Sequence, residues 1–148
     1  MSDFTHKSDF SANFDVRRPM DAVRVLCGLF YVPHVIGKIT GYAGTVAFFA
    51  KAGFQPPAFF VLLAMVMEAA CAIGLILGIG TKYLGVVSAG LMAVAAYAIV
   101  ATRGLGWFWA GGGIEYLAFW GVMSLAVAAD AWQREPGLFG FFARPAHA

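Results

Sequence analysis

Five ionisable side chains lie within or beside long apolar stretches of the chain: Arg24, His34, Lys38, Glu68 and Glu115. A charge placed in hydrocarbon costs at least about 2.5–3.5 kcal/mol on insertion scales, so such side chains normally face the protein interior and pair with one another. His34 and Lys38 are four residues apart and share one face of a helix. The lysine is positive, the two glutamates are negative, and the histidine can accept a proton. A cluster that is neutral only after taking up a proton is suited to proton transfer.

Three uses of this cluster stay open at the level of sequence. Ion pairs between Lys38 and the acids Glu68 and Glu115 can simply hold helices together, as polar residues do in other membrane bundles. Alternatively, the cluster lines a polar pocket for a small redox-active or proton-carrying molecule. A metal site built from His34, Glu68 and Glu115 has suitable ligand types, although one histidine and two carboxylates on separate segments form a weak pattern.

The composition places the chain among membrane proteins. It has 148 residues, of which 61% are hydrophobic and 12% charged, and its mean hydropathy is +0.76. Soluble domains average roughly 45–50% apolar and about 25% charged residues. The net charge is only +2, and the basic residues are scattered along the chain. This excludes the clustered basic surface by which proteins bind nucleic acids. We therefore predict an integral membrane protein, in the cytoplasmic or inner membrane if the source is prokaryotic.

Four stretches are long enough to cross a bilayer, which takes about 20 mostly apolar residues. They cover residues 22–40, 57–80, 83–102 and 107–129. The predicted fold is all-α, a four-transmembrane-helix bundle with short loops and one longer loop between the first two helices. The predicted organisation is an N-terminal arm (1–20), a transmembrane domain (21–131) and an aromatic-rich interfacial tail (132–148). Within the longer loop, residues 46–51 are expected to form one or two helical turns along the membrane surface.

Basic residues beside the spans predict the orientation. With the N-terminus inside, Arg17, Arg18, Lys82 and Arg134 are cytoplasmic, against Lys51 and Arg103 outside. Both termini are then cytoplasmic.

At 1.5 Å per residue, His34, Lys38, Glu68 and Glu115 fall about 18, 24, 18 and 22 Å from the cytoplasmic end, within one layer. Arg24 lies near the cytoplasmic end, where its side chain can reach water or Asp21.

Small residues carry two further expectations. Gly111, Gly112 and Gly113 precede Glu115, and either allow close helix contact or break the helix beside a buried acid. In the third span, small or flexible residues recur at helical spacing and are expected to contact another helix rather than lipid. These residues are Gly85, Ser88, Ala89, Met92 and Ala96. Cys27 and Cys71 are expected to be small packing residues.

The pattern of these residues resembles the DoxX family of four-helix membrane proteins. The resemblance covers roughly residues 24–130 and rests on the order of the arginine, the His-Gly-Lys positions and the glutamates. The matching residues are Arg24, Gly28, Phe30, His34, Gly37, Lys38, Gly53, Pro56, Glu68, Gly74, Leu77, Gly78, Met92 and Glu115. Family members often have an arginine just after the second span, where this chain has Thr81 and Lys82.

The resemblance implies a role beside a redox complex, because some family members are named as parts of thiosulfate:quinone oxidoreductases. Carried over, it suggests that His34, Lys38, Glu68 and Glu115 line a quinone-type pocket and relay protons. We find no covalent cofactor motif in the sequence, so catalysis would need another membrane subunit as electron donor. The alternative is an accessory subunit that packs against a larger membrane complex without chemistry. A small-solute carrier is less favoured, because paired repeats with broken helices are not evident.

Overall fold

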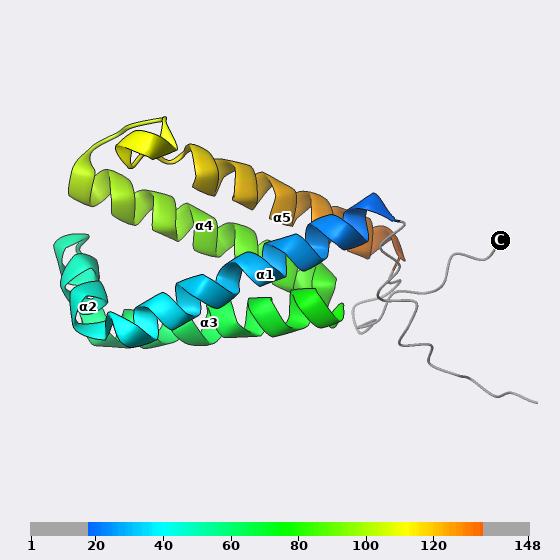
Figure 1. Cartoon of the computed structure of the whole chain (residues 1–148), viewed down its shortest axis with the longest axis horizontal. Coiled ribbons are helices and arrows are strands. Elements are labelled where there is room, and N and C mark those ends of the chain that lie inside the picture. The colour runs from blue at the N-terminus through cyan, green and yellow to red at the C-terminus, as the bar shows by residue number, and fades with distance from the viewer. Residues whose placement is uncertain (1–17, 135–148) are drawn as a thin grey trace, which may run out of the picture.

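The computed structural model describes residues 18–134, and within them it contains helices and no strand. Four long helices follow one another in alternating directions (Figure 1). They are α1 (Pro19–Thr40), α3 (Pro57–Leu77), α4 (Thr81–Arg103) and α5 (Glu115–Arg134), with the shorter α2 (Tyr42–Lys51) between the first two. The predicted all-α class is confirmed. The N-terminal arm up to residue 17 and the tail from residue 135 lie outside the described residues.

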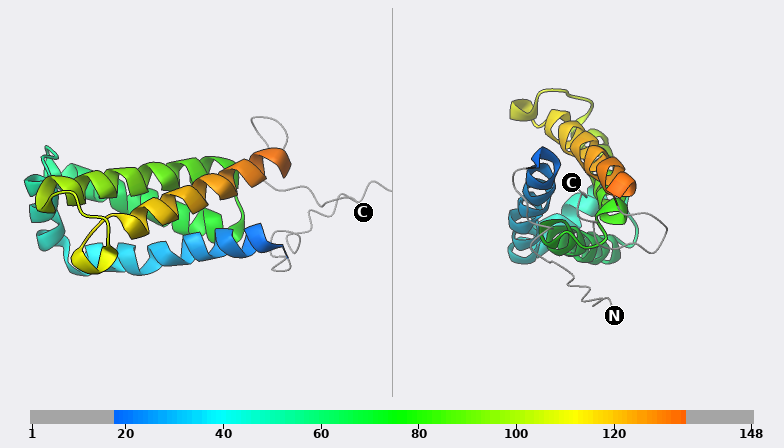
Figure 2. Two further views of the ribbon diagram at one scale, coloured as in Figure 1. Left: turned by 90° about the horizontal axis from the view of Figure 1, so that it is seen from above. Right: turned by 90° about the vertical axis from the view of Figure 1, so that its right-hand side faces the viewer.

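The four long helices enclose one core. Helix α1 packs against α3 and α5, and α4 packs against the same two helices, so each long helix has two neighbours. The start of α1 and the end of α5 lie at one end of the molecule, which we call the Arg24 end (Figure 2). Helix α2 and the connection 104–114 lie at the other, which we call the α2 end. Side chains near the end of α1 therefore meet those near the start of α3.

Local chemistry sets the limits of the first three long helices. Pro19 and Pro57 are the first residues of α1 and α3, a position where the missing N–H costs no hydrogen bond. Gly78 ends α3 with φ 72°, a left-handed conformation that favours glycine. Helices α1, α3 and α4 begin and end within three residues of the predicted spans.

The predicted start of the fourth span is wrong. Residues 104–114 form a connection with one 3₁₀ turn, η2 (Trp109–Gly111), and α5 begins only at Glu115. Gly112 has φ 79°, and a Cβ at Gly113 would lie 2.5 Å from the backbone carbonyl of Trp107. The three glycines therefore interrupt the helix just before Glu115, as one of the two expectations had it, but this acid is partly exposed and not buried. The apolar residues before them belong to a loop.

The longer loop between α1 and α3 contains more helix than expected. The prediction was one or two turns over residues 46–51, whereas α2 has 10 residues and starts immediately after Gly41. Helix α2 packs chiefly against α3, with lesser contacts to α1 and α4. It therefore covers the interior of the bundle at the α2 end.

The small-residue stripe of α4 contacts α5, as expected. Gly85, Ser88 and Met92 are buried, and a Cβ added to Gly85 would lie 2.7 Å from the carbonyl oxygen of Ser124. A Cβ on Gly121 of α5 would lie 3.5 Å from Met92 Cβ. Close backbone approach through small residues is typical of helix packing in membranes.

The outside of the bundle is apolar. Large side chains such as Ile39, Val66 and Phe119 are 59%, 67% and 64% exposed, and α1, α3 and α4 are long and apolar enough to cross a bilayer. Lipid is the solvent that such a surface requires, because large exposed apolar patches are rare on soluble monomers. The chain is therefore an integral membrane protein.

Candidate functional site

An ion pair between Lys38 and Glu68 is the centre of the candidate site. Lys38 lies in the last turn of α1, and its Nζ lies 2.8 Å from both carboxylate oxygens of Glu68 in the middle of α3. The two side chains are only 17% and 10% exposed. Such a pair compensates charges that would each be costly if left alone in a low-dielectric interior. The expected contact of Lys38 with one of the two acids is therefore present, with Glu68 as the partner.

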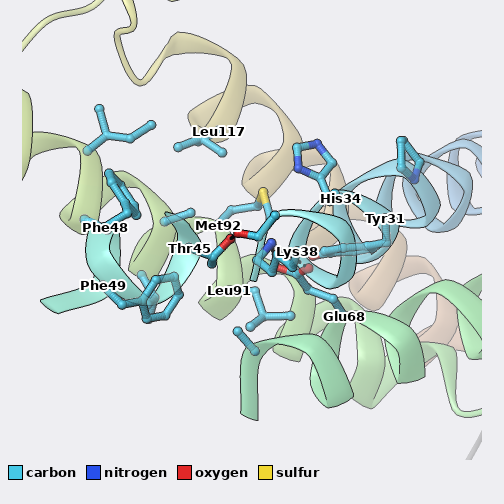
Figure 3. Close-up of a pocket in the computed structure, with 18 of the residues that line it drawn as sticks. Tyr31, His34, Lys38, Thr45, Phe48, Phe49, Glu68, Leu91, Met92 and Leu117 are labelled. Atoms are coloured by element: carbon cyan, nitrogen blue, oxygen red, sulfur yellow. Dashed lines mark hydrogen bonds and ion pairs between the residues drawn. The ribbon is translucent and has the colours of Figure 1, made fainter. Parts of the chain in front are cut away.

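This ion pair forms part of the wall of a cavity of about 630 Å³. Figure 3 shows Lys38 and Glu68 meeting beside the cavity, with side chains of α2 and α4 around them. The wall is otherwise mostly apolar, with His34, Thr45 and Arg103 as further polar residues. Apolar and aromatic residues around the pair include Tyr31, Phe48, Phe49, Leu91, Met92, Ala95, Leu117 and Trp120. We call this space the central cavity.

His34 lies near the ion pair without bonding to it. Its ring centroid is 5.5 Å from that of Trp120 in α5, and Figure 3 shows the ring on a different side of α1 from the Lys38 side chain. His34 is nevertheless part of the wall of the central cavity. It also lines a second cavity of about 880 Å³. His34 and Lys38 both line the central cavity, as the expected polar layer requires. Within the part of the chain that the structure describes, no hydrogen bond joins the two side chains.

Glu115 does not join the cluster, contrary to the depth estimate. Because α5 starts at Glu115, this residue stands at the α2 end of the bundle and not inside a span. Its carboxylate accepts a long hydrogen bond, 3.4 Å, from the backbone N–H of Trp109. It lines the second cavity with His34. The proposed metal set of His34, Glu68 and Glu115 is therefore not brought together, and no metal-binding group occurs within residues 18–134.

A chain of hydroxyl groups crosses the core next to the central cavity and was missed by the sequence reasoning. The Tyr31 hydroxyl lies 2.7 Å from Ser88 Oγ, which lies 2.8 Å from Ser124 Oγ. All three residues are fully buried. The chain links α1, α4 and α5, and Tyr31 also lines the cavity. The sequence feature that could have indicated this chain is the presence of these three hydroxyl side chains within otherwise apolar stretches.

Arg24 has a structural role at its own end of the bundle, where it is buried and meets Asp21, one of its two expected contacts. The residue is 2% exposed, and its guanidinium donates to the backbone carbonyls of Leu75 and Ile76. These carbonyls belong to the last turn of α3, which leaves acceptors without helical partners. Arg24 Nε also lies 3.8 Å from Asp21 Oδ1, the expected acidic neighbour.

Asp21 connects α1 with α5. Arg134 in the last turn of α5 lies 3.0 Å from Asp21 and 2.6 Å from Asp130. Lys82, at the start of α4, is completely buried, with its Nζ 5.0 Å from the ring centroid of Trp132. Contacts of charged side chains thus connect the four long helices at the Arg24 end. The candidate ligand site lies nearer the opposite end.

The two cysteines are free and buried. Cys71 Sγ lies 3.7 Å from the carbonyl oxygen of Leu84, and both residues belong to the apolar core. This placement agrees with the expected packing role.

Comparison with known proteins gives one match. The sequence model of the DoxX family matches residues 20–101, which include Arg24, His34, Lys38 and Glu68 but not Glu115. Searches of curated proteins and of solved structures find no match. The matched segment is more than half of the chain, and it contains both partners of the intramembrane ion pair. The chain belongs to the DoxX family of membrane proteins.

Proposed function

We propose that this protein is the membrane subunit of a redox complex and binds a quinone-type ring in the central cavity, beside Lys38 and Glu68. The observation that carries the proposal is an ion pair in the wall of an otherwise mostly apolar cavity of about 630 Å³. A purely structural ion pair needs no cavity, since packed side chains would complete its surroundings. Sites for small molecules typically have volumes of about 300–1,000 Å³, apolar walls and a few convergent polar groups.

The residues present fit such a ring. Aromatic side chains of α2 and α5, Phe48, Phe49 and Trp120, offer flat apolar surfaces. An ammonium group has three N–H donors, and Lys38 directs two hydrogen bonds to Glu68. One N–H therefore remains for an oxygen of the ligand.

A bound quinone would supply a centre that takes up protons together with electrons. Lys38 would then orient a ring oxygen and stabilise negative charge on it, as fixed positive groups do at developing oxyanions. Glu68 would hold the lysine in place and accept or release a proton as the charge of the site changes. His34, in the same wall, would be a further proton carrier. Electrons would come from another subunit.

We further propose that α5 is a fourth membrane span. It has 20 residues, which at 1.5 Å each extend about 30 Å, the thickness of the hydrocarbon core. Its charged residues Glu115, Asp130 and Arg134 stand towards its two ends. The flanking basic residues favour cytoplasmic termini, with Lys82 and Arg134 on the inner side and Lys51 and Arg103 on the outer side.

Quinone binding tests the proposal directly. The purified protein in lipid nanodiscs is titrated with ubiquinone-1 while quenching of tryptophan fluorescence is recorded, for the wild type and Lys38→Met. A charge-assisted hydrogen bond contributes about 1.5–3 kcal/mol, so the variant is expected to bind at least about tenfold more weakly. Lys51→Met is the matched control, because Lys51 is exposed and lies outside the cavity. Equal affinity of wild type and Lys38→Met would contradict the proposal.

The alternative, an accessory subunit without ligand, predicts a different pattern. In that case no saturable quinone binding occurs in the wild type, and Lys38→Met lowers only the yield of the folded protein or of its complex.

A further inference from the structure

The second cavity is a groove with an acidic residue and aromatic side chains in its wall. Its volume is about 880 Å³, and it is formed by the connection 104–114, α5 and His34 of α1. Its residues are His34, Trp107, Trp109, Glu115, Tyr116, Ala118, Phe119 and Val122. Lys38 and Glu68 are absent from this wall, so the groove offers a ligand other polar groups than the central cavity does.

Glu115 has no ion-pair partner among residues 18–134. Its carboxylate accepts the 3.4 Å hydrogen bond from the N–H of Trp109, near the long limit for such bonds. The residue is partly exposed. A carboxylate of this kind has accepting capacity left for a positively charged group from outside the chain.

The aromatic residues around Glu115 favour the same kind of group. Trp107, Trp109 and Tyr116 are 56%, 67% and 38% exposed, so their surfaces are open to a ligand. Faces of tryptophan and tyrosine attract cations, and aromatic cages recognise ammonium groups. A carboxylate together with several aromatic rings is therefore complementary to an ammonium ion and repels a purely anionic head group.

The groove continues along α5 as an apolar surface. Tyr116, Phe119 and Val122 are three residues apart and lie on one side of the helix. Phe119 and Val122 are 64% and 58% exposed, and the stretch from Tyr116 to Val122 measures about 9 Å at 1.5 Å per residue. Tryptophans concentrate where a membrane meets water, which puts Glu115 at the level of the lipid head groups and Val122 among the acyl chains.

We propose that this groove is a binding site for a phospholipid with an ammonium head group. The ammonium ion lies between Glu115 and the rings of Trp107 and Trp109, and one acyl chain follows α5 past Phe119 and Val122. The proposal needs α5 to lie in the membrane, but it does not depend on quinone binding in the central cavity.

Native mass spectrometry of the whole protein tests it. The protein is incubated with equal amounts of phosphatidylethanolamine and phosphatidylglycerol that have the same acyl chains, and singly lipidated species are compared. The wild type is expected to prefer phosphatidylethanolamine about fivefold, as a cation–π contact plus a carboxylate allows. Glu115→Gln and Trp109→Leu should each bring the ratio close to one. Phe59→Leu is the matched control, because Phe59 is a lipid-facing aromatic residue of α3 outside the groove.

Two results would overturn the lipid site. One is an equal affinity of the wild type for both lipids, which would mean that acyl chains alone fill the groove. The other is a preference that survives in both groove variants, which would place the selective site elsewhere. Ubiquinone-1 affinity of Glu115→Gln is measured in parallel and should stay at the wild-type value. A failure of the central site would thereby be distinguished from a failure of the groove.

Discussion

Removal of Lys38 alone should destabilise the protein strongly, and removal of both charges should not. Lys38→Met leaves the Glu68 carboxylate, which is 10% exposed, without its cation. Breaking a buried pair in this way typically costs about 3–5 kcal/mol. Because both side chains border a cavity, we expect a value near the lower limit, about 3 kcal/mol. The double variant Lys38→Met with Glu68→Gln leaves no uncompensated charge at this position and should lie within about 1 kcal/mol of the wild type.

Equilibrium unfolding in mixed micelles at pH 7, followed by circular dichroism, measures the stability of the single and the double variant. If the single variant were as stable as the wild type at pH 7, or if the double variant were as unstable as the single one, the ion pair would not have the energetic role assigned to it here.

Three further predictions concern packing and topology. Gly85→Ala should destabilise the bundle by about 1–3 kcal/mol, because its Cβ would lie 2.7 Å from a backbone oxygen of α5. Gly90→Ala is the control and should be tolerated, because no atom lies within 4 Å of the new Cβ. Thermal unfolding of the two variants measures the difference. Tyr31→Phe should cost about 1–3 kcal/mol, since it leaves a buried hydroxyl chain without one member, and chemical denaturation measures this loss. Lys51→Cys and Gln133→Cys should react with an impermeant thiol reagent from opposite sides of the membrane, and labelling from the same side would show that α5 does not cross it.

Sequence reasoning located the first three long helices because each is a continuous apolar stretch between glycine or proline residues. It failed at the fourth because Trp107, Phe108 and Trp109 are as apolar as the helix that follows. Composition does not distinguish a loop at the membrane surface from a span. The deciding feature was the glycine triplet at 111–113, whose left-handed and tightly packed residues interrupt the helix.

The candidate site was predictable in part for a related reason. Lys38 and Glu68 could be placed at similar depths, because the limits of their two helices at the Arg24 end were predicted to within three residues. Glu115 was assigned to the same layer because its depth was counted from residue 129, whereas α5 continues to Arg134 and begins only at Glu115. The burial of Arg24 depends on where the carbonyls at the end of α3 point, which is a tertiary feature that the spacing of residues in α1 does not contain.

His34 is the residue shared by the two cavities. It stands between the proposed quinone site and the proposed lipid groove, and its ring packs against Trp120. A variant such as His34→Ala therefore tests whether the two cavities communicate. In this variant, the affinity for quinone should change when the lipid in the groove is exchanged.

Photoaffinity mapping shows where on the chain a quinone binds. A photoreactive quinone analogue is activated in nanodiscs that contain the wild-type protein, and the modified peptides are identified by mass spectrometry. The proposed site predicts modification at residues of the central cavity, above all Met92, Leu117 and Trp120, with loss of that labelling when excess ubiquinone-1 competes or when Lys38 is replaced by methionine. Labelling confined to lipid-facing residues such as Val66 and Ile73, unchanged by competitor, would contradict a quinone site in the bundle.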